Sequence, residues 1–168
     1  MKFLALIPAR YASTRFPGKP LAILGEKPII QHVYERVCSV FDDAYVVTDD
    51  ERIETCVTSF GGRCVMTGTH HKSGTDRCYE ALEKLGAGYD VVVNVQGDEP
   101  FIAASQLETI KQCFNDAATQ IATLVKPFVP TDGIEALENP NSPKVVLDNN
   151  NYAVYFSHSE WISGTFHF

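Results

Sequence analysis

Three cationic side chains stand close together in one segment near the start of the chain. The segment between residues 8 and 20 carries two arginines, a lysine, a serine and a threonine, namely Arg10, Arg15, Lys19, Ser13 and Thr14. Small residues in such a segment let the backbone approach an anion, while the cations and hydroxyls hold phosphate oxygens. The pattern predicts a polyphosphate-binding loop, although it matches neither a Walker A loop nor a dinucleotide fingerprint. A solvated basic loop without a ligand is the alternative interpretation.

A second polar segment, residues 69–77, leads into an expected helix. Ser73 with Asp76 three residues later matches a capping box, and the free N–H groups at a helix start favour an anion. Asp76 is explained equally well as a capping residue alone. Arg77 would be a cation at the unfavourable end of the helix dipole, and an anionic partner would resolve that conflict. His70 and His71 are adjacent in the sequence, which is poor geometry for binding one metal ion together.

A third polar segment, residues 94–100, follows an apolar run. Gly97 permits a sharp turn there, so that Asp98 would lie just beyond the end of a strand. A carboxylate is a hard oxygen ligand of the kind that holds Mg²⁺ while the ion also bridges phosphates. The sequence Gly-Asp-Glu-Pro is also typical of an ordinary turn, and this alternative stays open.

The elements that must position these segments alternate between strands and helices. Short apolar runs predict strands over residues 3–7, 44–47, 64–66, 91–95 and 121–125, and an antiparallel hairpin formed by residues 145–147 and 152–156. Apolar residues at helical spacing predict helices that begin near residues 28, 48, 73 and 107. The run 91–95 is the richest in β-branched residues, and we expect it at the centre of the sheet.

This order of elements indicates an α/β fold with three layers and a mostly parallel sheet. In such sheets ligands bind outside the carboxyl ends of the strands, where all three polar segments are expected. A polyphosphate-binding loop, a helix start and a metal-binding carboxylate at one edge indicate nucleotide-dependent phosphoryl chemistry.

The composition excludes several classes of protein. The 168 residues are 45% hydrophobic and carry 14 Lys+Arg against 21 Asp+Glu, a net charge of −7, which is typical of one globular domain over residues 1–168. The acidic excess disfavours a nucleic-acid partner.

Five cysteines without a C-x-x-C pair indicate reduced thiols. No apolar run approaches transmembrane length, so we expect no membrane partner and a cytoplasmic location.

Four segments together resemble the family of 3-deoxy-manno-octulosonate cytidylyltransferases, the CMP-Kdo synthetases of bacterial lipopolysaccharide biosynthesis. They are residues 7–21, 47–50, 71–77 and 93–100, and the resemblance continues in the family's order to about Ser157. It implies a Rossmann-like nucleotidyltransferase fold with a mixed, mostly parallel sheet. It also implies that CTP and Kdo are the substrates, that CMP-Kdo and pyrophosphate are the products, and that Mg²⁺ is required. Full-length members of the family are expected to be homodimers.

The resemblance also implies roles for individual residues. Arg15 and Lys19 would bind the β- and γ-phosphates and stabilise the leaving pyrophosphate, and Asp98 would bind the metal. These three would be the catalytic residues. The remaining nucleotide-binding positions implied by the resemblance are Ala9, Arg10, Ser13, Ser73, Gly74, Arg77 and Gln96.

After Ser157 the sequence departs from the family's pattern. The family continues with an arginine and a proline-containing segment, then with a region that supplies much of the Kdo recognition, a second metal-binding aspartate and much of the dimer contact. Residues 158–168 do not resemble that continuation, so a fragment or a frameshifted reading is one expectation. Two alternatives stay open, namely another sugar-acid nucleotidyltransferase, similar to acylneuraminate cytidylyltransferases, and a nucleotide-binding module without catalysis.

Overall fold

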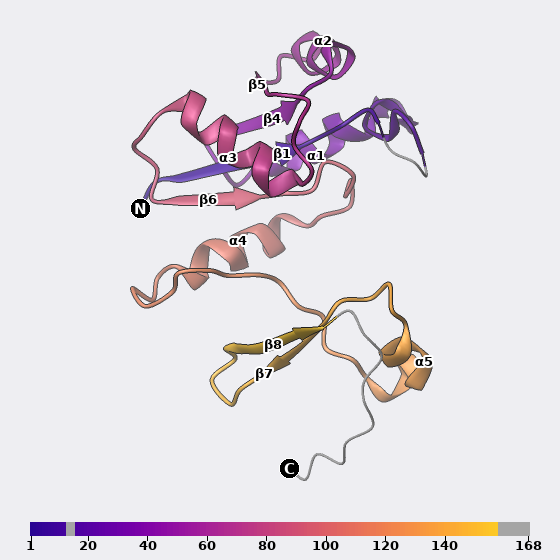
Figure 1. Cartoon of the computed structure of the whole chain (residues 1–168), viewed down its shortest axis with the longest axis vertical. Coiled ribbons are helices and arrows are strands. Elements are labelled where there is room, and N and C mark those ends of the chain that lie inside the picture. The colour runs from indigo at the N-terminus through magenta and orange to yellow at the C-terminus, as the bar shows by residue number, and fades with distance from the viewer. Residues whose placement is uncertain (13–15, 158–168) are drawn as a thin grey trace. The chain divides into compact units, whose positions relative to one another are not determined.

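The computed structural model describes residues 1–12 and 16–157. The chain forms two compact units, residues 1–122 and the residues from 123 onward (Figure 1). Each unit has its own elements. The expectation of one domain over residues 1–168 stays a prediction.

The first unit is built on a parallel sheet. Its strands, in the order in which they lie side by side, are β5 (Cys64–Met66), β4 (Ala44–Thr48), β1 (Phe3–Pro8) and β6 (Val91–Asn94). In this register Ala5 of β1 lies opposite Ala44 of β4 and Val93 of β6. These four predicted strands are confirmed to within one or two residues.

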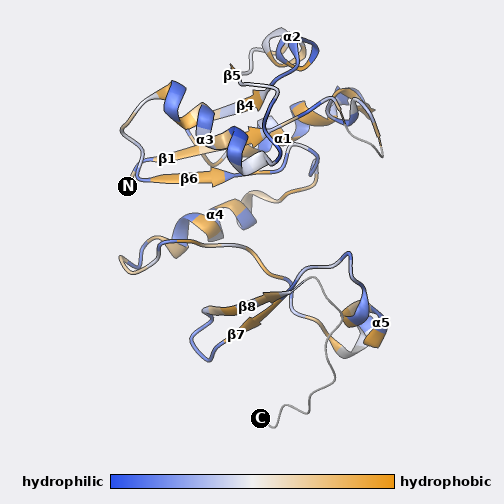
Figure 2. Ribbon diagram, viewed as in Figure 1, coloured by the Kyte–Doolittle hydropathy of each residue, from blue (hydrophilic) through white to orange (hydrophobic). Residues whose placement is uncertain are grey.

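Helices cover both faces of this sheet. Because successive residues of a strand point to opposite faces, β1 divides its side chains between two buried clusters. Ala5 and Ile7 pack with residues of α1 (Ile29–Cys38), α2 (Glu51–Ser59) and α4 (Ala104–Cys113). Leu4 and Leu6 pack with residues of α3 (Gly74–Leu85) on the other face. Figure 2 shows β1 as apolar along its length, as a strand buried on both faces must be. The predicted three-layer α/β fold is confirmed.

Two helices begin at side chains that cap them. The Asp50 carboxylate accepts the N–H of Arg52 at 3.0 Å where α2 begins. The Ser73 hydroxyl accepts the N–H of Asp76 at 3.1 Å where α3 begins. Such caps satisfy N–H groups that have no partner inside the helix. Both helix starts lie where the sequence predicts them.

The chain between β1 and α1 forms short local structures. They are a 3₁₀ turn, η1 (Lys19–Leu21), and a two-stranded antiparallel ribbon of β2 (Ile23–Leu24) and β3 (Lys27–Pro28). Pro28 immediately precedes α1, where the expected helix start lies. Within this connection the Ile29 N–H donates to the carbonyl of Ala22 at 2.9 Å, which ties the residue after η1 to the start of α1.

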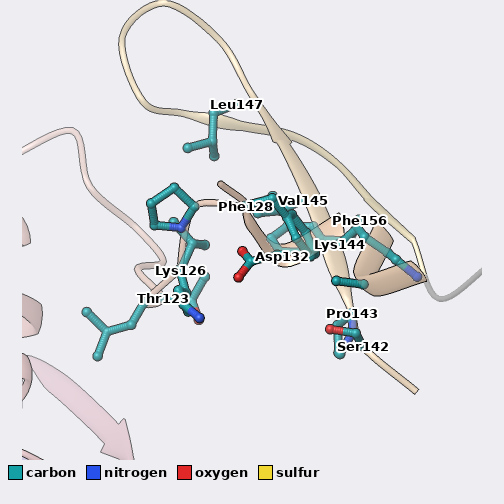
Figure 3. Close-up of a pocket in the computed structure, with 14 residues that line it drawn as sticks. Thr123, Lys126, Phe128, Asp132, Ser142, Pro143, Lys144, Val145, Leu147 and Phe156 are labelled. Carbon is teal, nitrogen blue, oxygen red and sulfur yellow. The ribbon is translucent and has the colours of Figure 1, made fainter. Parts of the chain in front are cut away.

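The second unit contains the predicted antiparallel hairpin. Its elements are the 3₁₀ turn η2 (Pro130–Asp132), α5 (Gly133–Glu138), β7 (Lys144–Leu147) and β8 (Ala153–Ser157). A hollow of about 870 Å³ lies against the hairpin and is lined largely by apolar side chains, among them Phe128, Val145 and Phe156 (Figure 3). Lys144 is buried beside it and donates to the carbonyl of Asn139 at 2.5 Å.

Two predictions about strands are wrong. Strand β6 lies at an edge, because among the described residues it pairs with β1 alone. Val91 and Val93 are buried on one face, whereas Val92 on the other is 39% exposed. A β-branched composition marks a strand but not its place in the sheet. Residues 121–125 form no strand, and Ile121 is 91% exposed, since a strand requires a partner for its backbone groups.

The thiols agree with the expectation from the sequence. All five cysteines are free. Burial raises the pKa of Cys64 and of Cys78 to about 12, which makes both thiols poor nucleophiles. Within the described part of the chain, no helix is both long enough and apolar enough to cross a membrane.

Candidate functional site

Two neighbouring hollows open at the carboxyl edge of the parallel sheet in the first unit. Their volumes are about 120 Å³ and about 180 Å³. Both are bordered by Pro8, Ala9, Arg10 and Gln96, which lie at or beyond the ends of the adjacent strands β1 and β6. Parallel strands end at the same edge, so the segments that follow them meet there. We call them the first hollow and the second hollow.

The backbone after β1 is held against β4. Ala9 is buried and donates its N–H to the carbonyl of Val47 at 2.9 Å. The backbone group that Ala9 can offer to a ligand is therefore its carbonyl oxygen rather than its N–H. The exposed side chain of Arg10 stands at the rim of both hollows, as a phosphate-binding cation must.

The basic loop closes on itself at Gly18. The N–H of Gly18 donates to the carbonyl of Tyr11 at 2.9 Å, and its φ of +70° lies in the left-handed region that favours glycine. This closure brings Lys19 back to the second hollow. Ser13 and Arg15 lie outside the described residues, so their roles stay predictions.

Gly97 lets the segment after β6 approach the end of β1. A Cβ atom at this position would lie 2.8 Å from the carbonyl oxygen of Pro8, closer than real Cβ atoms come to backbone. The side chain of the preceding residue, Gln96, borders both hollows and donates to the Asn94 side-chain oxygen at 3.0 Å. The predicted turn is present at Gly97, and the reason for a glycine there is packing, because the φ of Gly97 does not lie in the left-handed region.

Lys19 and Asp98 form an ion pair at the second hollow. Lys19 Nζ lies 2.7 Å from Asp98 Oδ2, and the two side chains are 37% and 50% exposed. A pair this exposed contributes at most about 1 kcal/mol, so an incoming phosphate and a metal ion can replace it. The sequence predicts that Lys19 binds phosphate and that Asp98 binds a metal ion. It does not predict the ion pair between the two.

The first hollow is walled by the segment that begins α3. His71, Lys72, Ser73 and Gly74 line it. A Cβ at Gly74 would lie 3.2 Å from Pro8 Cγ, so the missing side chain lets α3 approach β1 closely. The Ser73 hydroxyl is already used as the helix cap, and the N–H groups of the first turn favour an anion. His71 and Lys72 were not predicted to border the site, although both lie in a polar segment that the sequence marks.

Arg77 has an anionic partner within the chain. It is 4% exposed, and its Nη2 lies 2.9 Å from Asp49 Oδ2, while Nη1 donates to the Thr67 hydroxyl at 2.6 Å. A buried guanidinium needs such partners, because burying an unpaired charge is costly. The sequence favours a bound anion as the partner that offsets the unfavourable position of Arg77 in the helix dipole. In the structure the Asp49 carboxylate has that role. Arg77 borders the first hollow, and its contact with a nucleotide stays a prediction.

Asp49 and Thr67 are functional candidates that sequence reasoning missed. Asp49 directly follows β4, at the same edge as the hollows. Thr67 directly follows β5, is buried, and also donates its hydroxyl to the carbonyl of Thr48 at 3.1 Å. Their position after parallel strands was the available signal.

Asp98 is the candidate metal ligand of the site. Its carboxylate is exposed beside a hollow that carries Arg10 and Lys19. Mg²⁺ keeps several of its waters and binds one or two carboxylates together with substrate phosphates. A single accessible carboxylate among phosphate-binding cations therefore fits Mg²⁺. The whole arrangement is suited to holding and neutralising a polyphosphate.

A parallel sheet between helices, with anion-binding segments gathered at its carboxyl edge, defines an α/β nucleotidyltransferase fold. The family model described as Cytidylyltransferase matches residues 4–167. The chain belongs to this cytidylyltransferase family.

Similar proteins carry a more specific name. The 3-deoxy-manno-octulosonate cytidylyltransferase of Phocaeicola vulgatus is 71% identical over 159 residues, which cover 95% of this chain and 63% of that protein. The protein of the same name from Bacteroides thetaiotaomicron is 66% identical over 159 residues, 95% of this chain and 64% of that protein. The chain therefore spans slightly less than two thirds of the length of these curated relatives.

A solved structure supports the same relationship. It is described as CMP:2-keto-3-deoxy-manno-octonic acid synthetase complexed with CTP, and it matches with a TM-score of 0.86 at 41% identity. The match covers 96% of this chain and 66% of that one. The fold class and the family predicted from the sequence are confirmed.

Proposed function

We propose that this protein transfers CMP from CTP to Kdo, giving CMP-Kdo and pyrophosphate. The observation that carries the proposal is the meeting of Arg10, Lys19 and Asp98 around the second hollow in a member of the cytidylyltransferase family. The names of the relatives and the CTP in the similar solved structure support the choice of substrates. We place the reaction in the cytoplasm and in lipopolysaccharide biosynthesis.

In this reaction the protein's main tasks are to position the substrates and to neutralise charge. The anomeric hydroxyl of the sugar attacks the α-phosphorus of CTP and loses its proton. A new P–O bond forms, the bond between the α-phosphorus and the β-phosphate oxygen breaks, and pyrophosphate leaves with the electron pair. The charge in such a transition state is spread over phosphate oxygens, so cations held in place stabilise it.

Different residues of the two hollows neutralise the phosphates, hold the nucleotide and bind the metal ion. Lys19 leaves Asp98 and neutralises the phosphates of the leaving pyrophosphate, together with Arg10 and, from outside the described residues, Arg15. The start of α3, with Ser73 and Gly74, holds the nucleotide at the first hollow. Asp98 would hold Mg²⁺, which when bound supplies positive charge to the phosphate oxygens.

Asp98→Asn tests the proposal, because it keeps the shape of the side chain and removes the charge that holds Mg²⁺. We expect calorimetry to show Mg²⁺-dependent CTP binding weakened by about tenfold or more, since charge-assisted contacts are the strong ones. Glu108→Gln on α4, an exposed carboxylate paired only loosely with Lys111 at 3.6 Å, is the control and should bind like the wild type. Unchanged Mg²⁺ dependence in Asp98→Asn would remove Asp98 from the site.

A pyrophosphate-release assay separates the alternatives. Release with CTP, Mg²⁺ and Kdo supports the proposed reaction. Release with N-acetylneuraminate in place of Kdo would instead support an acylneuraminate-type enzyme. CTP binding without release from either sugar acid would support a nucleotide-binding module.

A further inference from the structure

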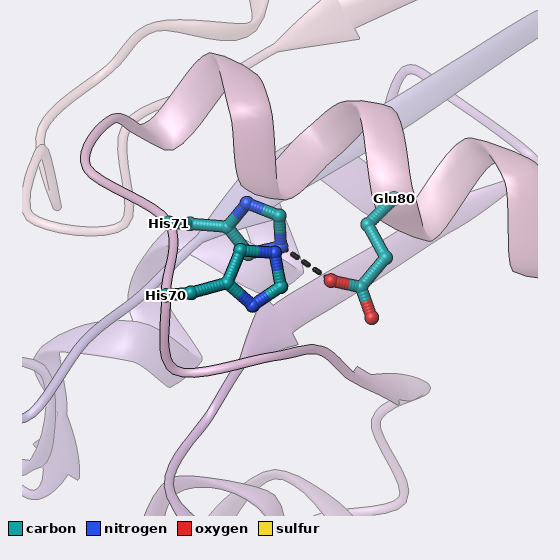
Figure 4. A group of neighbouring side chains, drawn as sticks. All are labelled: His70, His71 and Glu80. Atoms are coloured by element: carbon teal, nitrogen blue, oxygen red, sulfur yellow. Dashed lines mark hydrogen bonds and ion pairs between the residues drawn. The ribbon is translucent and has the colours of Figure 1, made fainter.

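His70, His71 and Glu80 form a cluster of metal-binding side chains beside the start of α3 (Figure 4). One ring nitrogen from each histidine and one carboxylate oxygen all lie within 4.8 Å of one another. The ring centroids of the histidines are 4.2 Å apart, and His71 Nε2 is hydrogen-bonded to Glu80 Oε2. We propose that these three residues bind a transition-metal ion such as Zn²⁺, at a site separate from Asp98.

The course of the loop makes joint binding by adjacent histidines possible. In an extended chain neighbouring side chains point to opposite sides. Here the chain turns at residues 69–70, and both rings lie on the side that faces Glu80 (Figure 4). Gly68 leaves room for this arrangement, because a Cβ there would lie 2.5 Å from the His70 ring. The objection that adjacency raises in the sequence does not apply to this turn.

The Glu80 carboxylate is already held in position to act as a ligand. Lys84 Nζ lies 2.7 Å from Oε1, and the N–H of Gly68 donates to Oε2 at 3.0 Å. Lys84, then His71 and the Gly68 N–H, lower the pKa of Glu80 to about 2, so the carboxylate is charged at neutral pH. Hydrogen bonds of this kind orient metal-binding carboxylates in known sites. A metal ion would take the place of the proton between His71 Nε2 and Glu80 Oε2.

The donor set selects the kind of metal. Two imidazole nitrogens and one carboxylate oxygen suit Zn²⁺, Co²⁺ or Ni²⁺, whereas Mg²⁺ and Ca²⁺ prefer oxygen ligands throughout. Two histidines and a glutamate with a water in the fourth position form a familiar zinc site. His70 is exposed, while the side chains of His71 and Glu80 are 9% and 22% exposed. The cluster is therefore open to solvent on one side, from which an ion and its water can enter.

The cluster also touches the candidate nucleotide site through one residue. His71 lines the first hollow together with Ser73 and Gly74. A metal ion on His71 would hold the segment that walls this hollow. That consequence rests on the proposed function, whereas metal binding itself does not.

The test is a Co²⁺ titration of metal-free protein without nucleotide, followed by visible absorption, together with Zn²⁺ calorimetry. We expect one equivalent of metal in the wild type and binding weakened by about tenfold or more in His70→Ala and in Glu80→Gln. Gly68→Ala keeps all three ligands but displaces the His70 ring, so it should weaken binding too. His32→Gln is the control, because His32 lies on α1 and hydrogen-bonds to the Leu24 carbonyl.

Three results would overturn the proposal. They are no Co²⁺ binding by the wild type, undiminished binding in both His70→Ala and Glu80→Gln, or a cobalt–thiolate absorption band that assigns the ion to cysteines. Thermal unfolding in EDTA shows whether each variant is folded before its metal affinity is compared. His70 is exposed, so His70→Ala keeps the test decisive even if Glu80→Gln loses stability.

Discussion

Gly97 lets the segment that carries Asp98 pack closely against the end of β1. A Cβ at residue 97 would lie 2.8 Å from the Pro8 carbonyl oxygen, and backbone cannot move aside as a flexible side chain can. We expect Gly97→Ala to lower the free energy of unfolding by about 1–3 kcal/mol, as overpacking does, and to weaken CTP binding by displacing Asp98. Denaturant unfolding and CTP calorimetry measure the two effects. A Cβ at Gly74 would meet only side-chain atoms of Pro8, Cγ at 3.2 Å and Cβ at 3.4 Å, so Gly74→Ala should lower the free energy of unfolding by less. An equal loss of unfolding free energy in the two variants would contradict this explanation.

At this scale the sequence identifies side chains by their chemistry but not by their partners. Lys19 and Asp98 could be predicted because a cation and a carboxylate each suggest a ligand of opposite charge. Their mutual pairing could not be predicted, because they are 79 positions apart in the sequence and only the adjacency of β1 and β6 brings them together. The same holds for Arg77, whose partner Asp49 comes from the end of another strand.

Among the elements, α2 shows how one residue fixes a helix start and its response to pH. The Asp50 carboxylate accepts the Arg52 N–H, and hydrogen bonds from the Arg52 side chain hold the pKa of Asp50 below its ordinary value of 3.8. Because the folded-state pKa is depressed, its stabilising contribution is complete above that value and is lost as the pH falls. Asp50→Ala should cost about 1 kcal/mol of stability at neutral pH, whereas Asp50→Asn keeps the cap and costs less.

Thermal unfolding of the wild type and of both variants between pH 7 and pH 2 checks this prediction. The difference between the wild type and Asp50→Asn should shrink toward the acidic end, because protonation of Asp50 removes the charge that Asn lacks at every pH. A difference that is constant across the range would show that the Asp50 charge contributes nothing to stability.

Local signals explain why most helices and strands were predictable, and strand pairing explains why two predictions about strands failed. The caps at Asp50 and Ser73 and the apolar runs of β1 and β4 are encoded within a few residues, and the structure confirms them. The place of β6 at an edge depends on which strands pair with it, and no residue of β6 encodes that. Residues 121–125 have strand composition but no partner strand among the described residues.

At the scale of the whole molecule, the two units differ in their buried apolar clusters and in the site residues they contain. Both large buried clusters and both hollows belong to residues 1–122. The second unit leaves large apolar side chains exposed, among them Val154, Tyr155 and Phe156 of β8. The first unit therefore has the core and the site residues that independent folding and nucleotide binding require.

Limited proteolysis with thermolysin, which cuts before large apolar residues, tests this division. The segment around residue 121 has no helix or strand, and Ile121 is 91% exposed, so its backbone can enter a protease without unfolding the sheet. We expect mass spectrometry to find a stable fragment that begins at residue 1 and ends between residues 120 and 124. Once purified, it should bind CTP within about twofold of the intact chain, because the residues that line both hollows remain together. Ile121→Asp should slow the cut. An early cut inside the sheet, or a fragment that has lost CTP binding, would show that the first unit depends on the second for its fold.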